Sequence, residues 1–124
     1  MKTFISLFAL FLSLSLTAQT NTEYWYIHPA NGNGIQTPSS TASGWSSTAM
    51  GFVTTASGYV STAMGYTTLA SGNYSTAMGE GTTASGNYST AMGANTEASG
   101  EYSTATGDRT KAIGDRSTAM GENT

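Results

Sequence analysis

The sequence predicts an all-β fold, a parallel β-solenoid built from coils of 14 residues. Three observations lead to this prediction. The decapeptide ASGNYSTAMG stands at 70–79 and again, unchanged, at 84–93, and a fixed period of this kind marks a repeat protein. Every seventh residue from Ala42 to Ala119 is alanine, and glycine follows two places after each. From Ala49 onward a serine or threonine also stands two places before each alanine, so the invariant residues recur at offsets of two, the side-chain period of a β-strand.

The first 18 residues, MKTFISLFALFLSLSLTA, predict a secretory signal peptide (1–18). Lys2 provides the positive start, an apolar run extends from Phe4 to Leu16, and small residues follow up to Ala18. The apolar run is shorter than the roughly 20 residues of a membrane-spanning helix. We therefore expect export, cleavage after Ala18, and no membrane insertion by the mature chain.

Residues 19–41 lie outside the repeat and predict a linker or N-terminal cap. They combine an aromatic cluster at 24–26 with two prolines and the turn-forming NGNG. The only histidine, His28, has no second histidine or cysteine to share a metal ion, because the chain contains no cysteine. We expect a solvated loop histidine here, and neither a metal site nor a cofactor.

Residues 42–124 form the repeat, with the unit [ST]-x-A-x-G-x-x. Each unit predicts a five-residue strand and a two-residue turn, with Ser/Thr, Ala and Gly pointing inward and the x residues outward. Two units make one coil, and roughly six coils advancing about 4.8 Å each would form a rod on the order of 30 Å long. A coiled coil is excluded, because it needs large apolar residues at spacings of three and four.

The two strands of a coil differ, since one carries STAMG and the other TTASG or a variant. Five methionines fall at the same position of the STAMG strand, and we expect them on one face. Burying an alanine methyl group contributes only about 0.8 kcal/mol to the stability of the fold, so a single rod would be marginally stable. We therefore expect copies of the chain to associate through this face. The alternative is that methionine fills a wider interior. The candidate subunit face consists of Met50, Met64, Met78, Met92 and Met120.

Aromatic residues occupy the turns that follow ASG and predict a column along one edge of the rod. Tyr and Trp are favoured at interfaces, so this column is a candidate ligand contact or subunit contact. Phe52 and Tyr66 mark the opposite edge. Two NYS sequences begin at Asn73 and Asn87, and we expect these asparagines to adopt the positive φ that a turn requires. The aromatic column comprises Trp45, Tyr59, Tyr74, Tyr88 and Tyr102.

The segment GNYSTAMGEGTTASG resembles the YadA-like head repeats of trimeric autotransporter adhesins. The resemblance covers residues 42–124, and Ser75, Ala77 and Gly79 match the invariant positions of that repeat. It implies a left-handed parallel β-roll, a homotrimer, and display at the cell surface, on the outer membrane or outside the cell, with matrix proteins or surface glycans as partners. Thr, Met and Ser replace the aliphatic residues common at the x positions of the family.

The composition and the residue spacing argue against several classes of function. A net charge of −3 with only 9% charged residues argues against nucleic acid as a partner. No spacing brings a nucleophile, a base and an orienting acid together, so we do not expect an enzyme. An adhesin-like head module is therefore the favoured function. A passive spacer or fibre repeat is the alternative, and an ice-binding solenoid with threonine ranks is a further one.

Overall fold

The computed structural model describes residues 26–27 and 34–124. The predicted signal peptide (1–18) and the part of the predicted linker that holds His28 lie outside the described residues.

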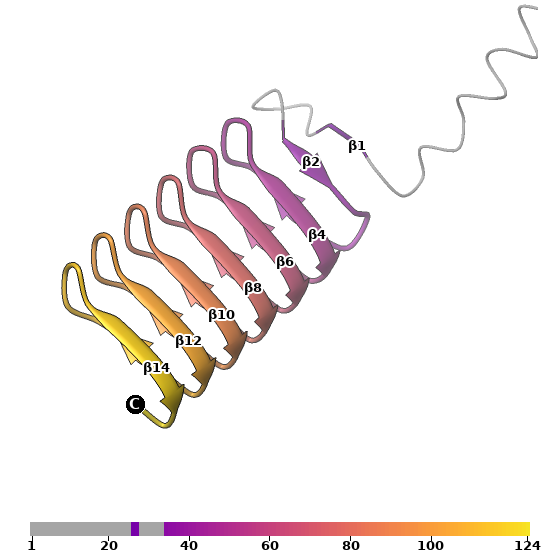
Figure 1. Ribbon diagram of the computed structural model, residues 1–124. Helices are drawn as coiled ribbons and strands as arrows, with labels where there is room; N and C mark the ends of the chain where they lie inside the picture. Colours follow the sequence, from indigo (N-terminus) through magenta and orange to yellow (C-terminus); the bar gives the residue numbers. More distant parts are fainter. Residues whose placement is uncertain (1–25, 28–33) are drawn as a thin grey trace, which may run out of the picture.

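The described residues form the predicted parallel β-solenoid, in which successive coils stack into a rod (Figure 1). One sheet has eight strands and the other has six. The larger sheet contains β1 (Tyr26–Ile27), β2 (Ile35–Gln36), β4 (Thr48–Phe52), β6 (Thr62–Tyr66), β8 (Thr76–Glu80), β10 (Thr90–Ala94), β12 (Thr104–Asp108) and β14 (Thr118–Glu122). The smaller sheet contains β3 (Thr41–Ala42), β5 (Thr55–Ala56), β7 (Leu69–Ala70), β9 (Thr83–Ala84), β11 (Glu97–Ala98) and β13 (Lys111–Ala112).

The 14-residue register is confirmed by the strand pairing. Thr76 of β8 pairs with Thr90 of β10, and Ala77 with Ala91, in parallel. Identical rungs therefore lie on one another, and every position of the repeat becomes a column along the rod. At the N-terminal end, β1 pairs antiparallel with β2 and occupies an edge that a sheet would otherwise leave open.

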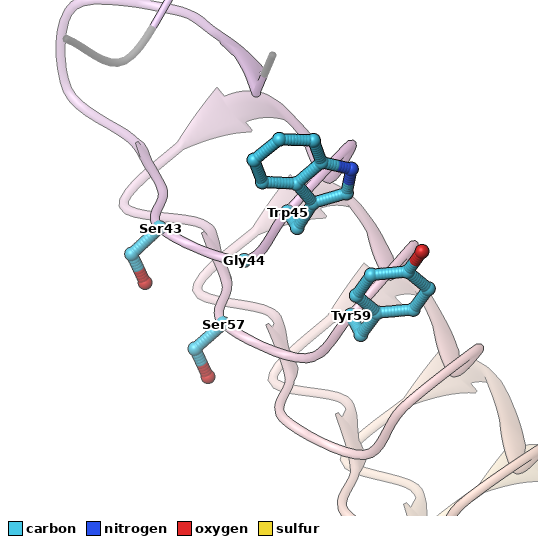
Figure 2. A pocket seen from close by; sticks show the side chains of 5 residues that line it. All are labelled: Ser43, Gly44, Trp45, Ser57 and Tyr59. Atoms are coloured by element: carbon cyan, nitrogen blue, oxygen red, sulfur yellow. The ribbon is translucent and has the colours of Figure 1, made fainter. Parts of the chain in front are cut away.

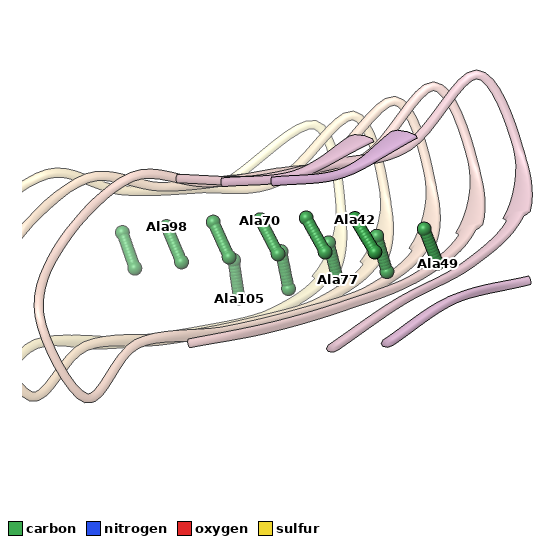
Figure 3. Close-up of a cluster of buried hydrophobic side chains, with 11 residues drawn as sticks. Ala42, Ala49, Ala70, Ala77, Ala98 and Ala105 are labelled. Atoms are coloured by element: carbon green, nitrogen blue, oxygen red, sulfur yellow. The ribbon is translucent and has the colours of Figure 1, made fainter. Parts of the chain in front are cut away.

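The core consists of alanine columns, as predicted (Figure 3), and buried serine and threonine flank them. From Ala42 to Ala112 the repeat alanines are at most 1% exposed. The Ser and Thr residues two places before each alanine are buried as well, from Ser47 to Thr110. Within the repeat, from Ala42 to Ala112, the two sheets thus leave room for small side chains only, whereas Gln36 of β2 is buried at the N-terminal end and accepts a hydrogen bond from the Ala42 amide at 2.7 Å.

The strands are unequal in length, and the prediction of a five-residue strand in every unit is wrong for half of the units. The STAMG strands have five residues, whereas the ASG strands have two. In the short strands two successive amides, those of Ser71 and Gly72, both donate to the carbonyl of Ala84, at 3.0 and 3.2 Å. Because one carbonyl serves two amides, the regular ladder ends there and the chain turns.

The glycines also divide into two groups, and the prediction that all of them point inward is wrong. Gly72 and its equivalents in the ASG strands are buried, whereas Gly79 and most of its equivalents in the STAMG strands are exposed. Gly79 has a φ of 118°, and a Cβ there would collide with the carbonyl oxygen of Gly93 in the next coil. Glycine is therefore required at this position by backbone conformation and close approach together.

Each coil contains two turns that need a residue at positive φ. One follows the long strand, and Val53, Thr67 and Gly81 are among the residues that occupy it. The other is a Gly-x-x-Ser turn closed by a backbone bond, as from the Ser75 amide to the Gly72 carbonyl at 3.2 Å. We call it the Gly-Ser turn, and its residues are 44–47, 58–61, 72–75, 86–89, 100–103 and 114–117.

Candidate functional site

The methionines lie outside the core on the long-strand sheet. Met50, Met64, Met78 and Met92 align in register and are half-buried. The alternative that they fill a wide interior is wrong, since alanine, serine and threonine occupy it. Thr106 continues the column, and Met120 is the most exposed member, at 67%. We call this column the methionine face; its role as the subunit contact stays a prediction.

The Gly-Ser turns hold the predicted aromatic column, and three of its members form a continuous stack. The rings of Tyr74 and Tyr88 lie 5.0 Å apart with planes 6° from parallel. The rings of Tyr88 and Tyr102 lie 4.9 Å apart at 5°. Beyond Tyr102, the guanidinium of Arg116 lies 5.9 Å from the ring centroid, within the range of a cation–π contact. Arg116 belongs to the same stack, which the sequence prediction did not include.

The asparagines of these turns act differently from the prediction. Tyr74 and Tyr88 adopt the positive φ of 57°, and Asn73 and Asn87 do not. The side chains instead connect coils: the Tyr59 amide donates to Oδ1 of Asn73 at 3.0 Å, and the Asn73 amide to Oδ1 of Asn87 at 3.1 Å. Asparagine is thus present as a hydrogen-bond acceptor. The tyrosines occupy a conformation that is uncommon for residues other than glycine, and ring stacking offsets part of its cost.

Trp45 and Tyr59 do not continue the parallel stacking of the three tyrosines. They occupy the first variable position of the Gly-Ser turn, whereas Tyr74, Tyr88 and Tyr102 occupy the second. The ring of Tyr59 meets that of Tyr74 at 70°, edge to face. Among the described residues, the ring contacts of this edge run from Tyr59 to Tyr102 and do not include Trp45. The predicted column is therefore a stack of three parallel rings with Tyr59 edge to face at its N-terminal end, and Trp45 lies on the coil before Tyr59 without a ring contact to it.

A shallow pocket lies at this pair (Figure 2). It has a volume of about 480 Å³. Trp45 and Tyr59 are 51% and 46% exposed, so both rings are available to a ligand. The pocket is lined by Ser43, Gly44, Trp45, Ser57 and Tyr59.

The opposite edge of the same coils is also apolar. The rings of Phe52 and Tyr66 are stacked 5.7 Å apart at 6°, and the neighbouring Val53 is about half exposed. After Tyr66 the corresponding strand position changes to Glu80. This aromatic pair is therefore confined to the N-terminal part of the rod.

Charge is distributed unevenly along the rod, a feature that the sequence shows and that the prediction overlooked. Residues 34–79 contain no Asp, Glu, Lys, Arg or His, and Glu80 is the first charged residue of the described repeat. Eight of the exposed large hydrophobic residues lie before residue 70. The N-terminal half of the rod is thus uncharged and apolar at its edges, whereas the C-terminal half carries all the repeat's charges.

The cations of the C-terminal half lie close to acidic or aromatic groups. Nζ of Lys111 lies 3.1 Å from a carboxylate oxygen of Glu97. Arg109 contacts Asp108 at 2.8 Å and Glu122 at 3.4 Å. The Glu97–Lys111 pair also interrupts the column of outward residues on the short strands, which begins with threonine. That sheet therefore presents no unbroken rank of threonine.

The described residues bring no three His, Cys, Asp or Glu side chains into an arrangement that could hold a metal ion. In the same part of the chain, no helix is long and apolar enough to cross a membrane.

Comparison with protein families agrees with the geometry. The model of the YadA head domain repeat matches residues 42–68, 56–82, 70–96 and 98–124. A search of the curated proteins found no match. The matched segments together span most of the chain, and their first residues are separated by 14 or 28 residues, in agreement with the 14-residue register seen in the sheets. The chain therefore belongs to the family of YadA head domain repeats, the head modules of adhesin-type proteins.

Proposed function

We propose that this chain is an exported, surface-displayed attachment module, in which three copies pack through the methionine face and the Gly-Ser turns contact the target. The family supports the adhesin-type head. The observation that carries the proposal is the stacking of identical rungs, which turns each outward position into a column. Such columns present the same contact repeatedly along the rod, which suits an extended target.

The methionine face supports the predicted homotrimer. Four methionines in register form an apolar stripe along the sheet, and stripes of this kind are normally covered by a partner. The apolar face contributes more to stability when it is buried between copies than when it is left in water.

Two measurements test the proposal. Light scattering of the full chain is expected to give three times the mass of one chain, and Met78→Asp is expected to release monomers. Ser85→Asp is the matched control, because Ser85 is exposed directly after β9 of the other sheet, and this substitution should leave the mass unchanged. A wild-type monomer would contradict the trimer.

Attachment is tested with beads that carry the full chain on surfaces coated with collagen, with fibronectin or with mucin. Retention on one of these surfaces, above that of uncoated controls, is the expected result. If no surface retains the beads, the rod is better explained as a passive spacer. Thermal hysteresis of the solution would instead indicate ice binding, against which the interruption by Glu97 and Lys111 argues.

A further inference from the structure

We propose that Trp45 and Tyr59 form a carbohydrate subsite, which takes a ring of a neutral glycan. This inference deepens the proposed attachment function and rests on it. It assigns the N-terminal coils, and not the whole aromatic column, as the place of contact.

The aromatic rings along this edge differ in whether their faces are covered by a neighbouring ring. Tyr74, Tyr88 and Tyr102 cover each other's faces, since their planes are parallel within 6° at about 5 Å. The ring of Tyr59 is turned by 70° from that of Tyr74, so a face of Tyr59 remains outside the stack. Figure 2 shows the rings of Trp45 and Tyr59 one after the other on consecutive coils, and the two residues are 51% and 46% exposed. The pair therefore presents two aromatic faces on consecutive coils.

An aromatic face carries excess negative charge. A pyranose ring presents polarised C–H groups on one side and hydroxyls around its rim, so its C–H side packs on such a face while the hydroxyls stay hydrated. The indole N–H of Trp45 and the phenol hydroxyl of Tyr59 can form hydrogen bonds at the edge of the same rings. The pair thus combines the two contacts that a sugar ring needs.

The surroundings of the pair are uncharged in the described part of the chain. No charged residue occurs in residues 34–79, so these coils offer an acidic glycan no cation and a basic peptide no carboxylate. In the C-terminal half, Arg116 covers the end of the tyrosine stack. The ligand that matches the uncharged half is therefore neutral.

The shape of the site also suits a sugar ring. It is a shallow, open depression of about 480 Å³, so a ring can lie on the aromatic faces while its hydroxyls stay in water. Gly44 lines the pocket, and a Cβ at this position would collide with the carbonyl oxygen of Gly58. The amides of Ser43 and Gly44 donate to the carbonyl of Ala56 at 3.0 and 3.1 Å, so the next coil holds the backbone at the base of the site. On the opposite edge Phe52 and Tyr66 stack face to face, so that edge offers no comparable pair.

The test is isothermal titration of the full chain with neutral tetrasaccharides of glucose, N-acetylglucosamine, mannose and galactose, and with the acidic tetragalacturonate. We expect at least one neutral tetrasaccharide to bind. Trp45→Ala should then weaken binding by about tenfold or more. Tyr88→Ala, which removes a ring from the stack on the same edge, should change the affinity by less than about twofold. Trp45→Phe keeps an aromatic face and should retain most of the affinity, which separates loss of the ring from loss of the fold.

The inference is overturned if no neutral tetrasaccharide binds, if only tetragalacturonate binds, or if Tyr88→Ala weakens binding as much as Trp45→Ala. The two assays distinguish a wrong subsite from a wrong attachment function. Bead retention without saccharide binding would refute the subsite alone. Saccharide binding without retention on any coated surface would refute the attachment function alone.

Discussion

The substitution Thr82→Val tests how the interior of the rod is stabilised. Thr82 is fully buried, and its hydroxyl oxygen has no hydrogen-bond partner. The other threonines of this interior column share both properties. They are Thr54, Thr68, Thr96 and Thr110. A buried hydroxyl without a partner has lost its hydration and gained nothing in return, so its removal should stabilise the fold.

The magnitude follows from the desolvation of one polar group. Leaving a buried donor or acceptor unpaired costs about 1–3 kcal/mol, and valine has nearly the shape of threonine, so no cavity forms. We expect Thr82→Val to raise the free energy of unfolding by about 1 kcal/mol, which corresponds to a rise of several degrees, roughly 4–8 °C, in Tm.

Chemical denaturation of the full chain measures this change, at one fixed protein concentration because association raises apparent stability. Ser61→Ala is the control, since Oγ of Ser61 donates to the Gly58 carbonyl at 2.8 Å. Its loss should lower stability by about 1 kcal/mol. If Thr82→Val instead lowers stability by about the same amount, the threonine hydroxyl has a partner in solution, such as an internal water, and the reasoning fails.

Three further predictions concern the backbone. Gly79→Ala should lower the free energy of unfolding by more than about 2 kcal/mol, because φ is 118° and a Cβ strikes the next coil; thermal unfolding measures it. Thr67 and Gly81 are equivalent residues at positive φ, a conformation that costs threonine more than glycine. Thr67→Gly should therefore raise the free energy of unfolding by about 0.5–1 kcal/mol, and Gly81→Thr should lower it. Changes of the same sign in chemical denaturation would contradict this reasoning. Deletion of residues 70–83 removes one coil and should preserve the β-type circular dichroism per residue. Deletion of 70–82 shifts the register by one residue and should abolish it.

The period and the core of the rod could be predicted from the sequence because both depend on identity between repeats. Alanine recurs at offsets that place it on one side of a strand, and Ala77 and its equivalents are indeed buried. The strand lengths could not be predicted in this way. They depend on which amides share a carbonyl, as those of Ser71 and Gly72 share that of Ala84, and this sharing arises only when coils stack.

In the turns, the conformational preference of each residue type does not predict which residue adopts positive φ. Asparagine tolerates positive φ better than tyrosine does, yet Tyr74 and not Asn73 adopts it. Contacts between coils explain why tyrosine and not asparagine has positive φ here. The Asn73 side chain accepts a hydrogen bond from the Tyr59 amide, and the ring of Tyr74 packs on that of Tyr88. Contacts between coils therefore outweigh a local preference of about 1 kcal/mol.

The difference between interior positions and turn positions explains where binding specificity can reside. Interior positions alternate only between alanine, serine and threonine, and they are hidden from any ligand. Turn side chains contact mainly the coils above and below, so they can change without altering the core. Along this chain they change from Trp45 and Tyr59 to a tyrosine stack and then to Arg116. A rod of uniform rungs can thus carry a local binding site, because only the turns distinguish one coil from the next.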